Sequence, residues 1–389
     1  MIQLAKPEAC SGCMACAAAC PKDAIAIGRD SLGNIVPSVD PERCIDCGAC
    51  RKACPVLTPP ERNDSSRAYA VWSLDPQSRK TSTSGGAAAE FYARALADGW
   101  WICGAEYTAD GRVVHTLTRE TEGIARFKQS KYVFSETGAV YRQIREKLDA
   151  GERVLMISLP CKIAGLLGYL RKPYPNLLTV DIVCHGTPSD QLLQEHIQSV
   201  CPGLGTYRLS FRADNEYIFR LEAGGEDVYR KIGRTDAYLA AFLEGLSYRS
   251  ACYQCSHARP QRVSDLTICD FWGLGAEIPF DHPYTGAISA VLVNTAEGQA
   301  FFDRCRDALF VEERPVEEAV KGNAQLTAPT PAHPKRAAFE AQYARSGFDQ
   351  AVKSVLRDEM DAARKDIQRR QLRSGLRRIA GIFLKRYRG

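Results

Sequence analysis

Two runs of cysteines near the start of the chain have residue types and a spacing that suit an inorganic redox centre. They are CSGCMACAAACP at residues 10–21 and CIDCGACRKACP at residues 44–55. In each run three cysteines stand two residues apart and a fourth precedes a proline, which is a pattern that holds iron–sulfur cubes. Three thiolates wrap one cube, and the fourth reaches across to the other. The first predicted cluster takes Cys10, Cys13, Cys16 and Cys54, and the second takes Cys44, Cys47, Cys50 and Cys20.

The alternative for these runs is a pair of structural zinc sites. Zinc modules seldom repeat an eight-cysteine arrangement with a proline after each fourth ligand, so we favour the clusters. Residues 1–58 are then expected to form a two-cluster ferredoxin module, with short strands and a turn between the runs. Such a module passes single electrons, so its partner is expected to be a redox protein or a reduced coenzyme.

A third C-x-x-C pair, Cys252 and Cys255, lacks partner cysteines nearby in the sequence. Cys161 directly follows an expected strand at 153–159 and opens a helix, whereas Cys184 ends the next expected strand. If the two strands are parallel neighbours, both thiols lie at the carboxyl edge of one sheet, where ligands of α/β proteins gather. We predict that these four cysteines hold a third cluster. The alternative is that Cys161 and Cys184 are plain buried thiols.

The remaining cysteines are isolated, and we interpret them as structural: Cys103, Cys201, Cys269 and Cys305. A hydroxyl- and glycine-rich stretch at 79–91, RKTSTSGGAAAEF, leads into an expected helix. Successive amides at a helix start bind phosphate, so the pyrophosphate of FAD would fit there, although an ordinary cap and turn is the alternative. A second stretch at 126–138 offers Lys128 and Lys131 beside Tyr132, and by itself it is also consistent with a solvated loop.

These residues need a scaffold, and the chain beyond a proline- and polar-rich linker at 55–67 alternates strand-like with helix-like segments. We expect strands at 68–74, 100–107, 112–118, 153–159, 176–184, 207–213, 217–223, 264–271 and 287–294. Helices are expected at 85–99, 138–152, 161–170, 189–200, 236–247 and 297–308. The predicted fold class is mixed α/β or α+β, with a ferredoxin-like two-cluster module followed by a larger domain around a central mixed sheet.

The predicted domains are the ferredoxin module at 1–58, an N-terminal part of the larger domain at 68–150, its C-terminal part with the third cluster at 151–330, and a basic helical tail at 336–389. From Arg364 onward the chain has ten Lys or Arg and one acid, a local charge of +9. Because the whole chain has a net charge of +5, the residues before Arg364 carry −4. A mildly acidic body gives little support for nucleic-acid binding. The tail places Leu372, Leu376, Ile379 and Phe383 near one helical face. Such a helix binds an anionic membrane surface or a partner, or is simply solvated.

The first cysteine run begins at Cys10 without an apolar stretch before it, and no apolar run is long enough to cross a bilayer. Clustered rather than dispersed cysteines also suit a reducing compartment. We therefore expect a cytoplasmic protein, with contact at the inner face of the membrane as an option for the tail.

Five stretches occur in the order seen in the coenzyme F420 hydrogenase/dehydrogenase beta-subunit family. They are TSTSGG, FKQSKYVFSETGAVYRQI, SLPCKIAGLLGYL, LLTVDIVCHGTPS and CYQCSHARPQRVSDLTICDFWG. The chain resembles this family over roughly residues 68–310, and a ferredoxin module precedes that part in many members. Members are flavoproteins that use FAD and 4Fe–4S clusters. Some exchange electrons with the deazaflavin coenzyme, others reduce chlorophyll intermediates, and many bacterial members lie in polysaccharide-synthesis loci.

The resemblance implies that Ser84, Gly85 and Gly86 lie at the flavin phosphates. It also implies that Ser130, Lys131 and the SLPC loop, which includes Ser158 and Pro160, border the flavin, and it favours the third cluster. Two positions differ from the family pattern. Ser158–Leu159–Pro160–Cys161 stands where many relatives have Gly-Thr-Pro-Cys, and Cys269 replaces a glycine before Asp270. The first difference falls at an expected flavin or substrate contact, so the natural electron partner stays open.

Iron–sulfur centres pass single electrons, whereas a small organic acceptor takes two, and a flavin converts between them. We predict an iron–sulfur, flavin-dependent reductase or dehydrogenase that acts on a small organic substrate or a deazaflavin-type coenzyme. Candidates for proton delivery are Lys131, His185 and Asp270, for each of which an orienting structural role is the alternative. Two other functions are an electron-transfer beta subunit without its own substrate and a metal-bound scaffold without redox work.

Overall fold

The computed structural model describes residues 2–213 and 216–386, with side chains up to residue 370 and at Leu372. The chain divides into two compact units, each assembled from separate segments. The first unit comprises Met1–Gln194, Arg212–Asn215 and Tyr248–Pro331. The second unit comprises Glu195–Phe211, Glu216–Ser247 and Ala332–Gly389. The domain boundaries drawn from the sequence stay predictions.

The ferredoxin module at the N-terminus repeats one small motif twice. A residue in the left-handed conformation precedes each short helix: Met14 (φ 63°) caps α1 (Ala15–Ala19), and Gly48 (φ 72°) caps α2 (Ala49–Ala53). Between the helices, β1 (Ile25–Arg29) and β2 (Ile35–Val39) pair antiparallel. The short strands expected between the cysteine runs are therefore present.

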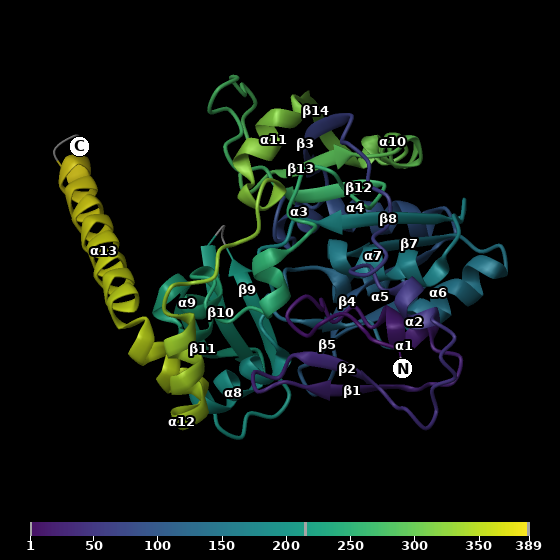
Figure 1. Ribbon diagram of the computed structural model, residues 1–389. Coiled ribbons are helices and arrows are strands. Elements are labelled where there is room, and N and C mark those ends of the chain that lie inside the picture. The colour runs from purple at the N-terminus through teal and green to yellow at the C-terminus, as the bar shows by residue number, and fades with distance from the viewer. Residues whose placement is uncertain (1, 214–215, 387–389) are drawn as a thin grey trace. The chain divides into compact units, whose positions relative to one another are not determined.

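A nine-stranded mixed sheet forms the centre of the first unit among the described residues (Figure 1). Its spatial order is β14 (Leu309–Arg314), β3 (Arg67–Ser73), β13 (Ser289–Val293), β12 (Leu266–Asp270), β8 (Leu177–Ile182), β7 (Val154–Ser158), β4 (Trp101–Tyr107), β5 (Val113–Thr118) and β6 (Ser135–Glu136). Strands β4, β7, β8 and β12 run in one direction. Strand β3 shares it, because β3 and β12 are each antiparallel to β13. The predicted mixed α/β fold with a central mixed sheet is confirmed.

Helices accompany this sheet in the first unit, and several of them match the expected ranges closely. They are α3 (Pro76–Lys80), α4 (Ala87–Ala97), α5 (Glu122–Phe127), α6 (Val140–Asp149), α7 (Pro160–Leu170), α10 (Ala296–Asp303) and α11 (Val316–Gly322). Short 3-10 turns are η2 (Ser250–Gln254), η3 (Arg306–Ala308) and η4 (Ala324–Leu326). One apolar cluster contains side chains of α6, α7 and β7 together with Cys13, Ala15 and Ala53. The ferredoxin module and the sheet therefore share a hydrophobic core.

The second unit has its own small sheet in the order β11 (Glu226–Ile232), β10 (Glu216–Ala223) and β9 (Arg208–Ala213). It also contains η1 (Gly233–Thr235), α9 (Ala237–Leu243), α12 (Arg336–Val355), α13 (Arg357–Arg386) and the larger part of α8 (Asp190–Val200). A fully buried histidine, His196, lies between two carboxylates: Nδ1 is 2.6 Å from Asp349 Oδ1 and Nε2 is 3.0 Å from Asp236 Oδ2. This network joins the three segments of the unit.

Strands β11 and β14 were not predicted from the sequence. Both carry many charged residues, EDVYRKI and LFVEER, and their charged side chains contact solvent or each other along exposed edges. The backbone of the predicted helical tail is helical to Arg386. The predicted apolar stripe of Leu376, Ile379 and Phe383 falls on side chains outside the described ones. Among the described helices, none is both long and apolar enough to span a membrane.

Candidate electron-transfer site

Each set of four cysteines predicted in the ferredoxin module lines one cavity. The first cavity is lined by Cys10, Cys13, Cys16 and Cys54, with apolar walls that include Leu4, Ile27 and Ile35. The second cavity is lined by Cys20, Cys44, Cys47 and Cys50, with Ile2, Ala24 and Ile45. The crossed arrangement, in which the fourth cysteine of each run joins the other run, is therefore present in the fold. Their role as ligands stays a prediction.

The backbone of the module supports these thiols locally. Gly12 and Met14 in the first run, and Asp46 and Gly48 in the second, all have positive φ angles, which curl each loop around its cavity. The amide of Gly12 lies 3.4 Å from Cys10 Sγ, and the amide of Ala24 lies 3.2 Å from Cys20 Sγ. Amides directed at sulfur stabilise the negative charge of a bound cluster.

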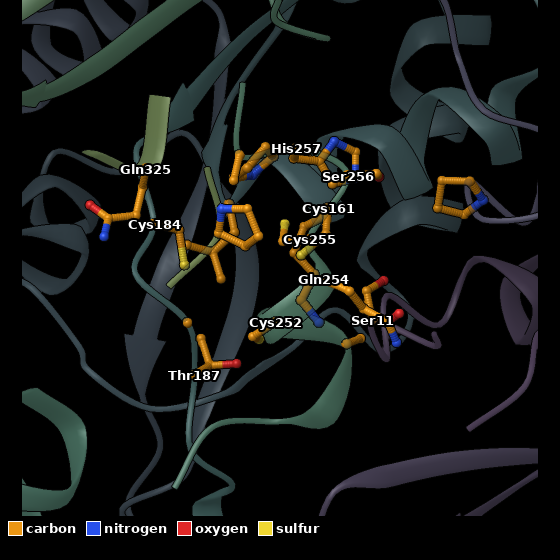
Figure 2. Close-up of a pocket in the computed structure, with 18 of the residues that line it drawn as sticks. Ser11, Cys161, Cys184, Thr187, Cys252, Gln254, Cys255, Ser256, His257 and Gln325 are labelled. Atoms are coloured by element: carbon orange, nitrogen blue, oxygen red, sulfur yellow. The ribbon is translucent and has the colours of Figure 1, made fainter. Parts of the chain in front are cut away.

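A third cavity, of about 230 Å³, brings together the four cysteines that lie far apart in the sequence. Figure 2 shows Cys161, Cys184, Cys252 and Cys255 around the same space, with Thr187, His257 and Gln325 at its margin. The strands that carry the first two thiols, β7 and β8, are parallel neighbours, as predicted. Cys161 is the second residue of α7, Cys184 follows the end of β8, and Cys252 and Cys255 lie on and after η2. Sheet pairing thus places this thiol set at the carboxyl edge.

Two cations without an ion pair among the described residues, Arg62 and Lys162, line the third cavity. A third lining cation, Arg262, is paired with Asp181 at 2.7 Å, and no Asp or Glu is among the described lining residues. Burial raises the pKa of the Cys161 thiol to about 12, and burial with nearby arginines lowers the pKa of His257 to about 3. The imidazole is therefore neutral, and the thiols become thiolates when a metal binds. A cationic wall favours a group with net negative charge, such as a cube held by four thiolates.

Within the described residues, no three His, Cys, Asp or Glu side chains are grouped as ligands of a single metal ion would be. Four thiols around each cavity are the donor set of a 4Fe–4S cube, so the residues present fit that cofactor. The isolated cysteines are placed differently. Cys103 and Cys305 are buried in apolar clusters, and Cys269 packs against a third one.

Ser84, Gly85 and Gly86 lie at the carboxyl end of β3, on the same edge as the third cavity. The Gly85 carbonyl accepts a hydrogen bond from the Ser73 amide at 2.7 Å, and Ser84 Oγ is 3.0 Å from Ser289 Oγ. A Cβ on Gly85 would lie 2.4 Å from the Val71 carbonyl oxygen, so only glycine fits there. Gly86 precedes α4 without a side-chain cap, which leaves the helix start open to an anion.

Two cations belong to the residues around this glycine turn. Arg79, in the helix that precedes it, lies over the Trp72 ring at 4.8 Å, and its Nε and Nη2 atoms are buried without a hydrogen-bond partner among the described residues. Lys128 Nζ lies 3.0 Å from Thr81 Oγ1. One carboxylate, Glu90 in the first turn of α4, accepts hydrogen bonds from Ser73 and Ser78. A helix start without a side-chain cap fits a pyrophosphate such as that of FAD.

Ser130 and Lys131 lie next to the same turn. The Ser130 amide donates to Thr83 Oγ1 at 2.8 Å, which joins the 126–138 stretch to the glycine-rich stretch. Lys131 Nζ donates to the Lys128 carbonyl at 2.9 Å, and burial lowers its pKa to about 8. The structure therefore brings together two stretches that the sequence analysis considered separately.

Ser158 and Pro160 lie at the end of β7, on the same sheet edge. Ser158 Oγ is buried 2.7 Å from Nε2 of His115, and His115 Nδ1 is 3.2 Å from the Glu136 carbonyl. Burial lowers the pKa of His115 to about 3, so this imidazole is neutral. Pro160 lines the third cavity. The serine that replaces the family glycine thus has a buried histidine partner.

The two other proton-delivery candidates also lie at this edge. His185 lines the third cavity, and burial lowers its pKa although the charge of Asp270 opposes the shift. Asp270 Oδ2 is 3.3 Å from Arg212 Nη1, and its Oδ1 is buried without a partner among the described atoms. Neither geometry distinguishes a proton donor from an orienting group.

Sequence reasoning missed three cations of this region, Arg79, Lys162 and Arg249. Charge alone predicts a solvated side chain, whereas Lys162 and Arg249 are buried and the partly exposed Arg79 buries its Nε and Nη2 atoms. Lys162 does carry one signal, because it is the only charged residue in the apolar helix CKIAGLLGYL.

Comparison with known proteins identifies two parts of the chain. Residues 151–319 match the family model for the C-terminal part of the "Coenzyme F420 hydrogenase/dehydrogenase" beta subunit, and residues 9–57 match the "4Fe-4S dicluster domain". No curated protein sequence matches the chain. Its structure is similar to a chain of the F420-reducing nickel–iron hydrogenase complex from Methanosarcina barkeri, at 14% identity, with 67% of this chain and 90% of that chain covered and a TM-score of 0.45. The chain therefore carries, at residues 151–319, the C-terminal part of the coenzyme F420 hydrogenase/dehydrogenase beta subunit, which belongs to an oxidoreductase family, and, at residues 9–57, a 4Fe–4S dicluster domain.

Proposed function

We propose that this chain is an iron–sulfur flavoprotein that passes electrons between three 4Fe–4S clusters and a small organic substrate through FAD. The first two clusters occupy the first and second cavities of the ferredoxin module. The third is held by Cys161, Cys184, Cys252 and Cys255, and the flavin lies along the carboxyl edge of the sheet.

One observation carries this proposal: cysteines from distant segments line a single cavity at the same sheet edge as the glycine turn. Ordinary core cysteines at 161 and 184 would not be expected to share a cavity with the C-x-x-C pair of Cys252 and Cys255, which begins about 70 residues after Cys184. The cavity also adjoins the module, because Ser11, Pro55 and Val56 line both it and the first cavity. The order of sites is thus second cavity, first cavity, third cavity and flavin.

FAD, when bound, supplies the conversion between one-electron and two-electron chemistry. The residues of this chain would hold and shield it. The open start of α4 after Gly86 would bind the pyrophosphate, Arg79 of the preceding helix would supply a cation to it, and the Ser130 amide contacts Thr83 next to the glycine turn. Lys131 has a pKa of about 8, so near neutral pH its ammonium can give a proton to a group bound at this edge.

The substrate is proposed from the family rather than from these residues. A deazaflavin-type coenzyme and a small molecule of polysaccharide synthesis are the two candidates that the family suggests, and either direction of electron flow suits this order of sites. The external partner is a redox protein or reduced coenzyme that meets the module.

Anaerobic measurement of iron, sulfide and flavin per chain tests the proposal. About twelve irons with one FAD support three cubes and a flavin. About eight irons per chain would contradict the third cluster. A colourless protein loaded with zinc would contradict any redox function.

A second candidate is an electron-transfer beta subunit of a hydrogenase-type complex that has no substrate of its own. The name of the matched family favours it. Co-purification with a larger catalytic partner and absence of turnover by the isolated chain support this alternative. Reduction or oxidation of a small molecule by the isolated chain contradicts it.

We also propose that the basic tail binds an anionic surface. Residues from Arg364 onward carry ten Lys or Arg and one acid. The full chain should bind vesicles rich in phosphatidylglycerol and should not bind neutral vesicles. A chain truncated after residue 363 should bind neither kind of vesicle. Equal binding by both chains would contradict membrane binding by the tail, whose role would then be to bind a partner protein or to remain a solvated helix.

A further inference from the structure

Two buried cations, Lys162 and Arg249, lie between the first and third cavities. Lys162 lines the third cavity, and its Nζ donates a 3.1 Å hydrogen bond to the carbonyl of Gly12, which lines the first. Arg249 Nη1 donates to the Cys10 carbonyl at 2.8 Å. The Arg249 carbonyl in turn accepts the amide of Cys252 at 2.9 Å. Each cation therefore links a loop of one cysteine set to a segment of the other.

One aromatic ring contacts both charges. Lys162 Nζ is 3.9 Å from the centroid of the Phe134 ring, and Arg249 Cζ is 5.4 Å from it. Gly12 permits this packing, because a Cβ there would lie 2.9 Å from Arg249 Nη2 and 3.2 Å from Phe134 Cε2. A cation that lies over an aromatic face is attracted to it, so the ring helps to hold both side chains in place.

Helix α7 brings the two cavities close. Gly165 faces the module, since a Cβ there would lie 2.9 Å from Cys13 Cβ and 3.0 Å from its sulfur. Gly168, one turn later, faces Ala53, because a Cβ on it would lie only 2.5 Å from the Ala53 carbonyl oxygen. The helix that begins with Pro160 and Cys161 therefore packs directly on Cys13, which lines the first cavity.

Neither cation has a carboxylate to balance it. Lys162 is 0% exposed and Arg249 is 3% exposed, and the ion pairs of the described residues include neither. The ionisable groups near Lys162 include the thiols of Cys161, Cys13 and Cys10, the guanidinium of Arg249 and the neutral imidazole of His115. A buried charge without an opposite charge is costly by several kcal/mol, so an anionic partner is expected in the cavities.

We propose that Lys162 and Arg249 are the electrostatic element that raises the reduction potentials of the clusters that the first and third cavities would hold. The inference rests on the proposed function, because it needs clusters in both cavities. A cluster gains negative charge when it is reduced, and a fixed cation beside it stabilises the reduced form. With clusters bound, the electron that one of them loses would be the electron that the other gains, so no proton and no further reagent would take part.

The test compares Lys162→Met, Lys162→Arg and Lys172→Met in the full chain with its clusters loaded anaerobically. Lys172 follows α7 but is 63% exposed, so solvent screens its charge and it serves as the matched control. Iron and sulfide per chain are measured first. Midpoint potentials follow from redox titration monitored by electron paramagnetic resonance.

Lys162→Met should retain its iron, and the equilibrium constant for reducing at least one centre should fall tenfold or more, which is 59 mV for one electron. Lys162→Arg and Lys172→Met should stay within threefold of the wild type. If Lys162→Met loads less iron, Arg249→Gln is measured in the same way and should shift the equilibrium in the same direction.

Full iron with every midpoint within threefold of the wild type in both charge-removing variants would overturn the inference. So would an equal fall in Lys162→Arg, because that result assigns the effect to packing rather than charge. A wild-type chain with about eight irons would defeat the third cluster alone. The inference would then be tested by the midpoint potential of the cluster in the first cavity, because Lys162 also lies near Cys13 of that cavity.

Discussion

The ferredoxin module and the third cavity present the same four-thiol arrangement, yet the chain builds them in different ways. In the module, left-handed turns at Gly12, Met14, Asp46 and Gly48 curl two short runs, so three thiols of each set are neighbours in sequence and only the fourth comes from the other run. The third cavity collects thiols from the ends of two parallel strands and from a 3-10 turn. The comparison teaches that a local motif carries its own geometry, whereas a dispersed set depends on the sheet.

Removing one thiol of the dispersed set should have the largest effect. Cys184→Ser is expected to lower the iron content from about twelve to about eight per chain and to abolish electron transfer to the flavin, because three thiolates do not hold a cube at this junction. Iron and sulfide analysis with electron paramagnetic resonance measures it. Cys201→Ser, which changes a cysteine that lines none of the three cavities, should keep all twelve. Unchanged iron in Cys184→Ser would make the third cavity a structural feature and break the comparison.

His196 tests whether the second unit is held by charge rather than by thiols. His196→Gln leaves Asp236 and Asp349 without the imidazolium between them and should cost about 3 kcal/mol of unfolding free energy. His282→Gln is the control, since His282 forms an exposed pair with Glu312 and should change stability by less than about 1 kcal/mol. Urea unfolding followed by circular dichroism measures both, and an equal loss in the two variants would contradict the role of the network.

The same histidine makes stability depend on pH. Burial lowers the pKa of His196, but Asp236 and Asp349 outweigh burial and raise that pKa to about 9. The folded state thus binds this proton more tightly than the unfolded state, whose value is about 6.5. The contribution is complete below about pH 6.5 and is lost as the pH rises through about 9. In urea unfolding across this window the wild type should lose stability, and His196→Gln should not.

Gly168→Ala sharpens the comparison at the contact between α7 and the module. The added methyl group would lie 2.5 Å from the Ala53 carbonyl oxygen, so the helix must move, at a cost of about 2 kcal/mol. Gly205→Ala, where a Cβ meets nothing within 4 Å and φ is ordinary, should change stability by less than about 0.5 kcal/mol. Urea unfolding of the loaded chain compares them. Equal stability of Gly168→Ala and the wild type would show that the module does not need this close contact.

The smallest expected effect concerns the glycine turn at the other end of the sheet edge. Arg79→Gln removes the unpaired guanidinium and should weaken FAD binding about tenfold, the value of one charge-assisted hydrogen bond of about 1.5 kcal/mol. Lys80→Gln removes an exposed charge from the next residue and should leave the dissociation constant unchanged. Flavin fluorescence during titration gives both constants. A similar loss in both variants would indicate long-range charge instead of a pyrophosphate contact.

Much of the fold could be predicted because it depends on short-range pattern. Alternation and apolar runs located β3, β4, β5, β7, β8, β12 and β13, and helical spacing located α4, α6 and α7. Strands β11 and β14 could not be predicted, because many of their residues are charged and their sequences do not alternate between apolar and polar residues. The interleaved segments of the two units also have no local signature, since contacts between distant residues define them.

The amino-acid sequence by itself determined the eight cysteines of the module, since thiol spacing and turn residues act within a few positions of each other. It also placed Cys161 and Cys184 at strand ends. Only the tertiary structure decided that these thiols share a cavity with Cys252 and Cys255, because parallel pairing of β7 with β8 brings them to one edge. It alone decided that Lys162 and Arg249 are buried between two thiol sets, since burial of a charge results from packing and not from the identity of the residue.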